Sequence, residues 1–188
     1  GAVLVDGVDV KDWDARDLRR RIGLVQQDVF LFAGTIGENI SLGDPELSRE
    51  HLEAAARHTN ADRFIRPLPK GYDQPVGERG VSLSAGQRQL LSFARVLAAN
   101  PEILVLDEAT ANIDTETEMW IQEAVGRLMQ QRTSLVIAHR LSTVRTADTI
   151  LVLHHGEVRE MGPHDALLAK RGLYYRLHQL QYGEGKSA

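Results

Sequence analysis

The chain alternates short apolar runs with amphipathic segments, which is the pattern of an α/β fold. Apolar runs predict strands at 2–5, 22–25, 103–106, 134–138, 149–153 and 157–161. Capping residues and apolar spacing predict helices at 14–20, 35–40, 48–58, 84–100, 116–129 and 141–145, with two short helices further on. The run 103–106 is apolar throughout, as expected of a strand buried on both faces of a parallel sheet. We therefore expect a mostly parallel sheet flanked by helices.

The predicted elements also suggest how the chain is divided. Between the strand at 22–25 and the helix at 84–100 the pattern is helical and broken by Pro67, Pro69 and Gly71. We expect residues 1–33 and 85–182 to form the core of the fold and residues 34–84 to form a small inserted helical subdomain. Residues 183–188 are polar and form a tail.

Composition excludes several classes of protein. The 188 residues carry a formal net charge of −4, which argues against a nucleic-acid-binding surface. The absence of cysteine excludes disulfides and thiolate metal sites. The sequence has no apolar run of about 18 residues, so we expect no segment of it to insert into a membrane.

The strand at 103–106 leads into two acidic residues, Asp107 and Glu108. The carboxyl ends of parallel strands are where ligands bind in open α/β sheets. A carboxylate there can hold Mg²⁺, directly or through water, and a second carboxylate can orient or deprotonate an attacking water. The competing interpretation is a strand that ends in an acidic turn.

The second chemical signal is the start of the helix at 84–100, in the stretch LSAGQRQ. Ser84 is a predicted N-cap, and small Ala85 and Gly86 follow it. Unpaired N–H groups and a partial positive charge at a helix start favour an anion, and small residues let a phosphate approach the backbone. A plain capped helix is the alternative, but Ser84 precedes Asp107 by 23 residues, about the length of a helix and turn that return to the sheet.

Two further polar residues follow predicted strands. His139 comes directly after the run 134–138, where it can contact a terminal phosphate if the strands are parallel. Gln27 follows the run 22–25, where its amide can touch Mg²⁺ or the attacking water. Either residue alone would be unremarkable on a protein surface.

Taken together, these motifs resemble ATP-binding cassette (ABC) transporter ATPases. The segments VQQDVFLF, LSAGQ, ILVLDEAT, ANID and IAHRLST occur in the order found in that family, and VGERG at 76–80 is similar to a loop particular to its exporters. The resemblance covers the whole chain. It implies a domain that binds ATP and Mg²⁺, acts as a nucleotide-sandwich dimer and drives export across a membrane.

The resemblance also implies roles for individual residues. Asp107 corresponds to the Walker B aspartate and Glu108 to the catalytic base, His139 to the switch histidine and Gln27 to the Q-loop glutamine. Ser84, Ala85, Gly86 and Gln87 correspond to the signature motif, which touches ATP held by a second nucleotide-binding domain. Asp114 corresponds to the D-loop aspartate at the dimer interface.

The implied partners are a second nucleotide-binding domain and the coupling helices of a transmembrane domain, at the cytoplasmic face of the inner membrane. Residues 77–80 correspond to the loop that touches those helices. The D-loop sequence ANID, followed by TETE, resembles one half of a heterodimeric exporter. A homodimer is the alternative.

One expected motif is absent from the sequence. A phosphate loop, G-x-x-x-x-G-K-[ST], precedes the first strand in this family, and the pattern occurs nowhere here. We expect the chain to be a piece of a longer protein that begins after this loop, and to be inactive by itself.

Two other functions compete with that of an exporter domain. One is a soluble ABC-type ATPase of DNA repair or chromosome upkeep, which carries a long coiled-coil insertion. Only 57 residues separate Gln27 from Ser84, which leaves room for a compact subdomain alone. The other is a non-catalytic binding module, which we would expect to lack Glu108 or His139.

Overall fold

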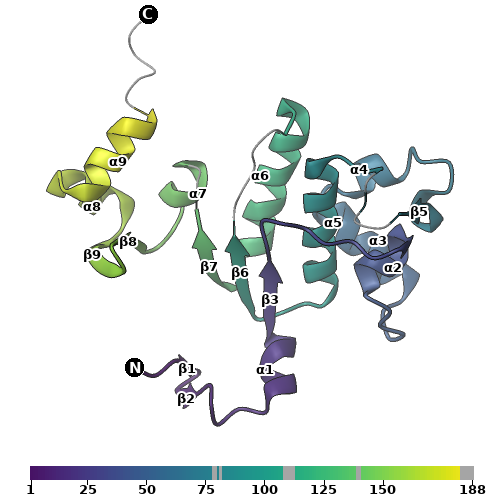
Figure 1. Ribbon diagram of the computed structural model, residues 1–188, viewed down its shortest axis with the longest axis horizontal. Helices are drawn as coiled ribbons and strands as arrows, with labels where there is room; N and C mark the ends of the chain where they lie inside the picture. The colour runs from purple at the N-terminus through teal and green to yellow at the C-terminus, as the bar shows by residue number, and fades with distance from the viewer. Residues whose placement is uncertain (78–79, 81, 108–112, 139–140, 183–188) are drawn as a thin grey trace, which may run out of the picture. The chain divides into compact units, whose positions relative to one another are not determined.

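The computed structural model of the chain describes residues 1–77, 80, 82–107, 113–138 and 141–182 (Figure 1). Contacts divide the chain into two compact units, Gly1–Ile137 and Ala138–Ala188. The helices and strands of the first unit, in chain order, are β1 (Leu4–Val5), β2 (Val8–Asp9), α1 (Ala15–Arg21), β3 (Ile22–Val25), β4 (Gly34–Thr35), α2 (Ile36–Ser41), α3 (Arg49–His58), α4 (Asp62–Ile65), the 3₁₀ turn η1 (Gly71–Asp73), β5 (Pro75–Val76), α5 (Ala85–Ala98), β6 (Ile103–Asp107), α6 (Thr115–Met129) and β7 (Thr133–Ile137).

The centre of the first unit is a three-stranded parallel sheet in the order β3-β6-β7 (Figure 1). In register, Val25 lies beside Leu106, and Asp107 lies beside Ile137. The three strands therefore end at the same edge of the sheet. The α/β fold with a parallel sheet and flanking helices is confirmed.

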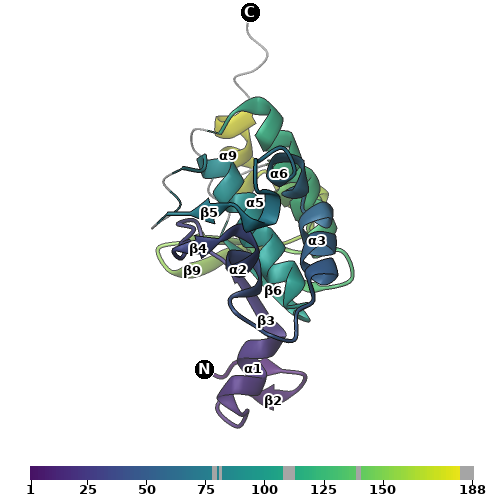
Figure 2. The ribbon, with the colours of Figure 1, turned by 90° about the vertical axis from the view of Figure 1, so that its right-hand side faces the viewer.

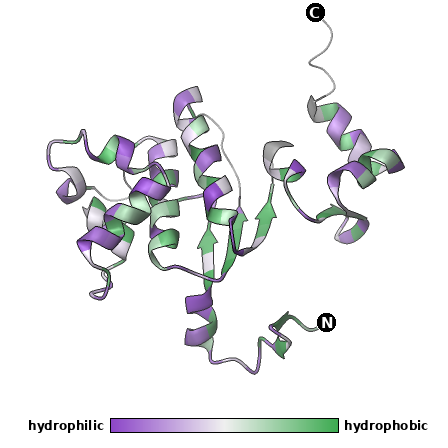
Figure 3. Cartoon of the chain, turned by 180° about the vertical axis from the view of Figure 1, so that it is seen from behind, coloured by the Kyte–Doolittle hydropathy of each residue, from purple (hydrophilic) through white to green (hydrophobic). Residues whose placement is uncertain are grey.

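Helices α5 and α6 pack on one face of this sheet and build the main core. The core includes Val25, Leu104 and Leu106 from the strands, with Phe93 and Ile121 from the two helices. Each of these side chains is at most 2% exposed. Figure 2, which faces the helical side, shows the helices in front of the strands, and Figure 3 shows that the strands are largely hydrophobic.

The opposite face of the sheet is apolar and open in the described structure. Leu24, Leu135 and Ile137 are each more than half exposed, and Ile103 and Val105 are partly exposed. The sequence predicted that the run 103–106, which forms β6, would be buried on both faces. The helices of the unit cover only the Leu104 face, so the other half of the apolar pattern meets no partner within the described residues.

The segment between β3 and α5 contains mostly short helices, each begun by a local cap. Thr35 forms a capping box with Glu38 at the start of α2, and the Ser48 hydroxyl accepts a hydrogen bond from the amide of His51 at the start of α3. These helices share the main core with α5 through side chains such as Ile40. That residues 34–84 form a separate subdomain remains a prediction.

The second unit contains α7 (Leu141–Arg145), the antiparallel hairpin β8 (Ile150–His154) and β9 (Glu157–Gly162), and helices α8 (His164–Lys170) and α9 (Leu173–Tyr182). The hairpin turns at His155 and Gly156, both with positive φ, between the two strands predicted from the sequence. Val152, Leu167 and Tyr174 form a small core. Among the described residues of both units, no helix is long and apolar enough to cross a membrane.

The packing of α5 against the sheet generates a stability prediction. A methyl group added at Gly23 would lie 2.6 Å from both Val96 and Pro101 side-chain atoms, so Gly23→Ala should lower the free energy of unfolding by about 1–3 kcal/mol through overpacking. The same substitution at Gly126, in the exposed surface of α6, meets nothing within 4 Å. Gly126→Ala should raise stability by about 0.5–1 kcal/mol, because alanine favours the helix.

Urea unfolding of both variants and the unchanged chain measures the two effects. Equal effects of the same sign at the two positions would contradict the described packing of Gly23.

Candidate functional site

The candidate site lies at the edge where the parallel strands end. Asp107 is the last residue of the central strand β6, and Gln27 follows β3 by two residues and is exposed. Because β3 and β6 are parallel neighbours, the structure brings these two residues to one edge. His139 comes two residues after β7, the other neighbour of β6, but His139 and Glu108 lie outside the described residues.

Helix α5 begins with a complete capping box at Ser84. The Ser84 hydroxyl accepts a hydrogen bond from the amide of Gln87 at 3.2 Å, and the Gln87 side-chain oxygen accepts one from the amide of Ser84 at 3.0 Å. The first turn holds no acidic residue. The partial positive charge of this helix start is therefore not neutralised by carboxylates of its own first turn.

Ala85 and Gly86 play different structural parts, which the sequence did not reveal. Ala85 is exposed, so its methyl group meets no packing constraint. Gly86 is buried, and an added methyl group would collide with the Thr117 side chain and lie 3.1 Å from an Ile113 side-chain atom. Gly86 thus permits the starts of α5 and α6 to pack closely, whatever further role it has toward a phosphate.

Asp114 caps the start of α6. Its carboxylate accepts a hydrogen bond from the amide of Thr117 at 2.9 Å, and hydrogen bonds from Thr117 hold the pKa of this carboxyl below its usual range. Glu116 and Glu118 stand in the same first turn. In contrast to α5, this helix start already carries its own negative charge.

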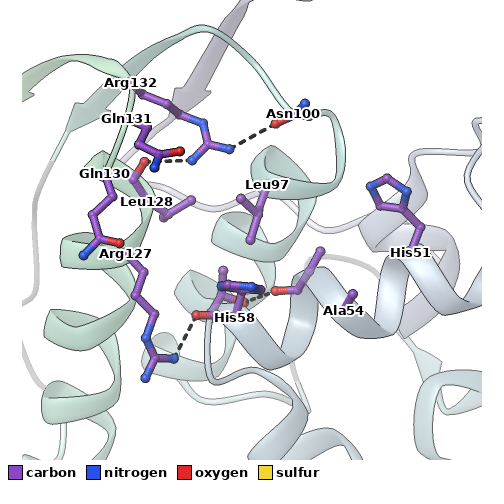
Figure 4. Close-up of a pocket in the computed structure, with 12 residues that line it drawn as sticks. His51, Ala54, His58, Leu97, Asn100, Arg127, Leu128, Gln130, Gln131 and Arg132 are labelled. Carbon is purple, nitrogen blue, oxygen red and sulfur yellow. Dashed lines mark hydrogen bonds between the residues drawn. The ribbon is translucent and has the colours of Figure 1, made fainter.

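An open pocket of about 480 Å³ lies at the opposite edge of the sheet, where α3, α5 and α6 end (Figure 4). Its two arginines, Arg127 and Arg132, donate hydrogen bonds to carbonyl oxygens at these helix ends. Arg127 donates to the carbonyl oxygen of His58 at 3.1 Å, and Arg132 donates to the carbonyl oxygen of Leu128 at 3.2 Å and to the Asn100 side chain at 3.1 Å. Cations at helix C-termini satisfy the last carbonyl groups. This pocket is remote from Asp107 and contains none of the predicted site residues.

Sequence reasoning missed two features near the candidate site. Gln89 is only 5% exposed and lines a small cavity with Asp107. Phe30 and Phe32, three and five residues after Gln27, are each 54% exposed with their rings edge to face at 5.0 Å. The segment after Gln27 is apolar in the sequence, but which of its side chains are buried depends on contacts that the sequence pattern does not show.

Comparisons with known proteins agree with this geometry. Residues 1–111 match the family model described as "ABC transporter". The chain is 53% identical over 186 residues, 99% of its length, to 31% of the ATP-dependent lipid A-core flippase of Syntrophus aciditrophicus. It is 51% identical over its whole length to 28% of the probable multidrug resistance ABC transporter ATP-binding/permease protein YheH of Bacillus subtilis.

A solved structure of a bacterial Atm1-family ABC exporter with ATP bound matches the fold. The TM-score is 0.89 at 44% identity, over all of this chain and 33% of that one. The chain thus spans about a third of the length of these relatives.

A parallel sheet whose central strand ends in a carboxylate, with helices returning along one face, belongs to the class of α/β domains that bind ligands at the carboxyl edge of the sheet. Within that class, the chain belongs to the ABC transporter family and is an ABC ATPase domain.

The lowered pKa of Asp114 generates a prediction about acid stability. A carboxyl whose pKa is lower in the folded chain stabilises the fold fully above its unfolded pKa of about 3.9, and this stabilisation is lost as the pH falls through the folded value. Asp114→Asn keeps a neutral cap that does not titrate. The difference in unfolding free energy between the chain and this variant should therefore shrink between pH 6 and pH 2.5.

Urea titrations at several pH values measure this difference. A constant offset across that range would show that the Asp114 carboxylate contributes no pH-dependent stability.

Proposed function

We propose that this chain binds and hydrolyses ATP as part of an exporter, in which a membrane-spanning portion moves the substrate. The observation that supports this most directly is the parallel order β3-β6-β7, in which the carboxyl ends of the three strands meet at the edge that holds Asp107. The names of the similar proteins, a flippase, a multidrug transporter and an Atm1-family exporter, favour export over DNA repair.

In this proposal Mg²⁺ is held by Asp107 and Gln27 together with ATP phosphates. A carboxylate, an amide oxygen and phosphate oxygens are the hard ligands that magnesium takes. Asp107 is a partly buried residue of the central strand, while Gln27 lies in the exposed segment after β3. Glu108 orients and deprotonates the attacking water, and His139 contacts the terminal phosphate.

The start of α5 serves a second nucleotide-binding domain in the proposal. Ser84 is exposed, its helix start lacks carboxylates, and Gln87 is bent back to cap the helix. Ser84 and the N–H groups of this turn, with Ala85 and Gly86, therefore contact the γ-phosphate of ATP bound on the partner domain, and Asp114 lies at the same interface. The partner is a second copy or a related subunit.

The membrane-spanning portion docks beside the segment after Gln27. Phe30 and Phe32 form an exposed aromatic pair that suits the apolar side of a short coupling helix. In this proposal the domain lies at the cytoplasmic face of the inner membrane, as part of the transporter. Neither nucleic acid binding nor insertion of this segment into lipid belongs to the proposal.

Glu108→Gln in the longer protein tests the catalytic assignment. The amide keeps the shape of the side chain but is no base, so ATP should still bind while hydrolysis falls by about 10² or more. Phosphate release and binding of a fluorescent ATP analogue, measured on the same preparation, separate the two effects. The 188-residue chain alone, which lacks the phosphate-loop pattern, is the control and should show no turnover.

Turnover close to that of the unchanged protein would mean that another group activates the water. Turnover by the 188-residue chain alone would show that this chain holds the phosphates of ATP without the phosphate-loop pattern, contrary to the proposal.

Ser84→Asp tests the contact with the partner's ATP. Aspartate caps a helix about as well as serine, so the fold should keep its stability, but the new charge would face the γ-phosphate across the interface. Repulsion between like charges should lower ATP turnover by more than about tenfold, with little change in ATP affinity of the open domain. Ser48→Asp, the same change at the cap of α3, is the matched control and should leave turnover intact.

Steady-state ATPase assays and nucleotide-binding titrations measure both variants. Equal effects at the two caps, or loss of ATP binding in Ser84→Asp, would argue against a contact in trans.

A further inference from the structure

Arg95 is a partly buried arginine on α5 that no catalytic or docking role above uses. Its Nε donates to the carbonyl oxygen of Asn39 at 2.9 Å, and its Nη1 donates to the carbonyl oxygen of Phe30 at 3.1 Å. Burial lowers the pKa of its guanidinium, which nevertheless stays charged at neutral pH. Among the described residues its hydrogen-bond partners are oxygens of neutral groups, so it joins segments rather than pairing with a carboxylate.

Asn39 continues this connection. It lies on α2 and is only 2% exposed. Its side-chain oxygen accepts from the amide of Phe32 at 2.8 Å and from Nη2 of Arg95 at 3.4 Å, and its side-chain nitrogen donates to the carbonyl oxygens of Phe32 at 2.9 Å and Thr35 at 3.0 Å. The amide therefore has its full set of partners, and they fix the backbone of Phe32 on both sides.

The consequence is a segment held from three directions. Arg95 holds the carbonyl of Phe30, Asn39 holds the amide and carbonyl of Phe32, and the side chain of Leu31 between them is fully buried in the core. These contacts leave the two aromatic rings facing outward. The orientation of this exposed pair thus depends on α5.

Helix α5 also carries the signature residues at its start. Eleven residues separate Ser84 from Arg95, which corresponds to about 16 Å along a helix that rises 1.5 Å per residue. The helix is continuous from Ala85 to Ala98. A displacement of its start therefore carries Arg95 and the carbonyl groups bound to it.

We propose that Arg95 is the positioning residue that couples α5 to the Phe30–Phe32 segment, so that closure around the partner's ATP moves the surface on which the membrane-spanning portion docks. This inference rests on the proposed function, and it identifies the residue that connects α5 with the Phe30–Phe32 segment. Arg95 touches neither nucleotide nor water in this proposal, and it acts through the backbone of Phe30 and through Asn39.

The experiment uses the longer protein in lipid nanodiscs, followed by hydrogen–deuterium exchange with mass spectrometry, without nucleotide and after trapping with Mg-ATP and vanadate. Arg95→Met keeps the apolar stem and removes the donors. Arg127→Met is the matched control, because Arg127 also joins two helices by donating to a carbonyl oxygen, far from Phe30. Samples are compared at equal occupancy by trapped nucleotide.

In the unchanged protein, trapping should alter exchange both in the segment 28–42 and in membrane-spanning peptides. In Arg95→Met the segment containing Phe32 should exchange faster, exchange in β6 should stay the same, and the response of the membrane-spanning peptides should be lost. Arg127→Met should keep that response. Arg95→Lys retains the charge and can make one of the two carbonyl contacts, so it should retain part of the response of the membrane-spanning peptides. If Arg95→Met does not fold, the same comparison is made with Arg95→Lys.

An unchanged response in Arg95→Met, or an equal loss in Arg127→Met, would overturn the inference while leaving the proposed function in place. A different result, in which the unchanged protein traps nucleotide but its membrane-spanning peptides never respond, would remove the proposed function and the inference with it.

Discussion

The parallel pairing of β6 with a strand on each side is the constraint on which the rest of the first unit depends. It places the ends of three strands at one edge, and it forces each connection to cross the sheet and return, which α5 and α6 accomplish. Both helices consequently start at the edge with Asp107 and end at the other. The partial positive charge of the N-terminal N–H groups of both helices therefore lies at the edge with Asp107. The partial negative charge of their C-terminal carbonyl groups lies at the opposite edge.

The two edges manage these charges in different ways. At the opposite edge, Arg127 and Arg132 donate hydrogen bonds to C-terminal carbonyl groups of α3 and α6, so the partial negative charge there is balanced by side chains of the same chain. At the near edge, α6 is neutralised by Asp114 and the acids of its first turn, while α5 is capped only by neutral Ser84 and Gln87. The start of α5 therefore keeps a partial positive charge that no carboxylate of its own first turn offsets.

The elements could be predicted largely because their signals are local. Asp14, Ser48 and Ser84 each cap a helix within three residues of themselves, and His155-Gly156 makes a turn by its own backbone preference. The edge that gathers Gln27 and Asp107 also followed, once the strands were taken as parallel.

Features that depend on distant contacts could not be predicted. Gly86 suggested close approach of a phosphate, but the reason visible in the fold is Thr117, 31 residues later. Arg95 is one basic residue among many in the sequence, and its importance appears only when Phe30 and Asn39 are brought to it across 65 and 56 residues. Burial of both faces was expected for β6. Each face needs a packing partner of its own, and the described helices cover only the face of Leu104 and Leu106.

The length of α5 has a mechanical consequence. A helix about 16 Å long between Ser84 and Arg95 acts as a lever, and a tilt of about 10° about its far end displaces its start by about 3 Å, roughly the length of one hydrogen bond. Small angular changes of this helix are thus sufficient to make or break a hydrogen bond at Ser84. In the other direction, Phe30 is joined through Arg95 to a helix whose backbone is continuous back to Ala85, so a displacement of Phe30 and a displacement of the helix start are mechanically linked.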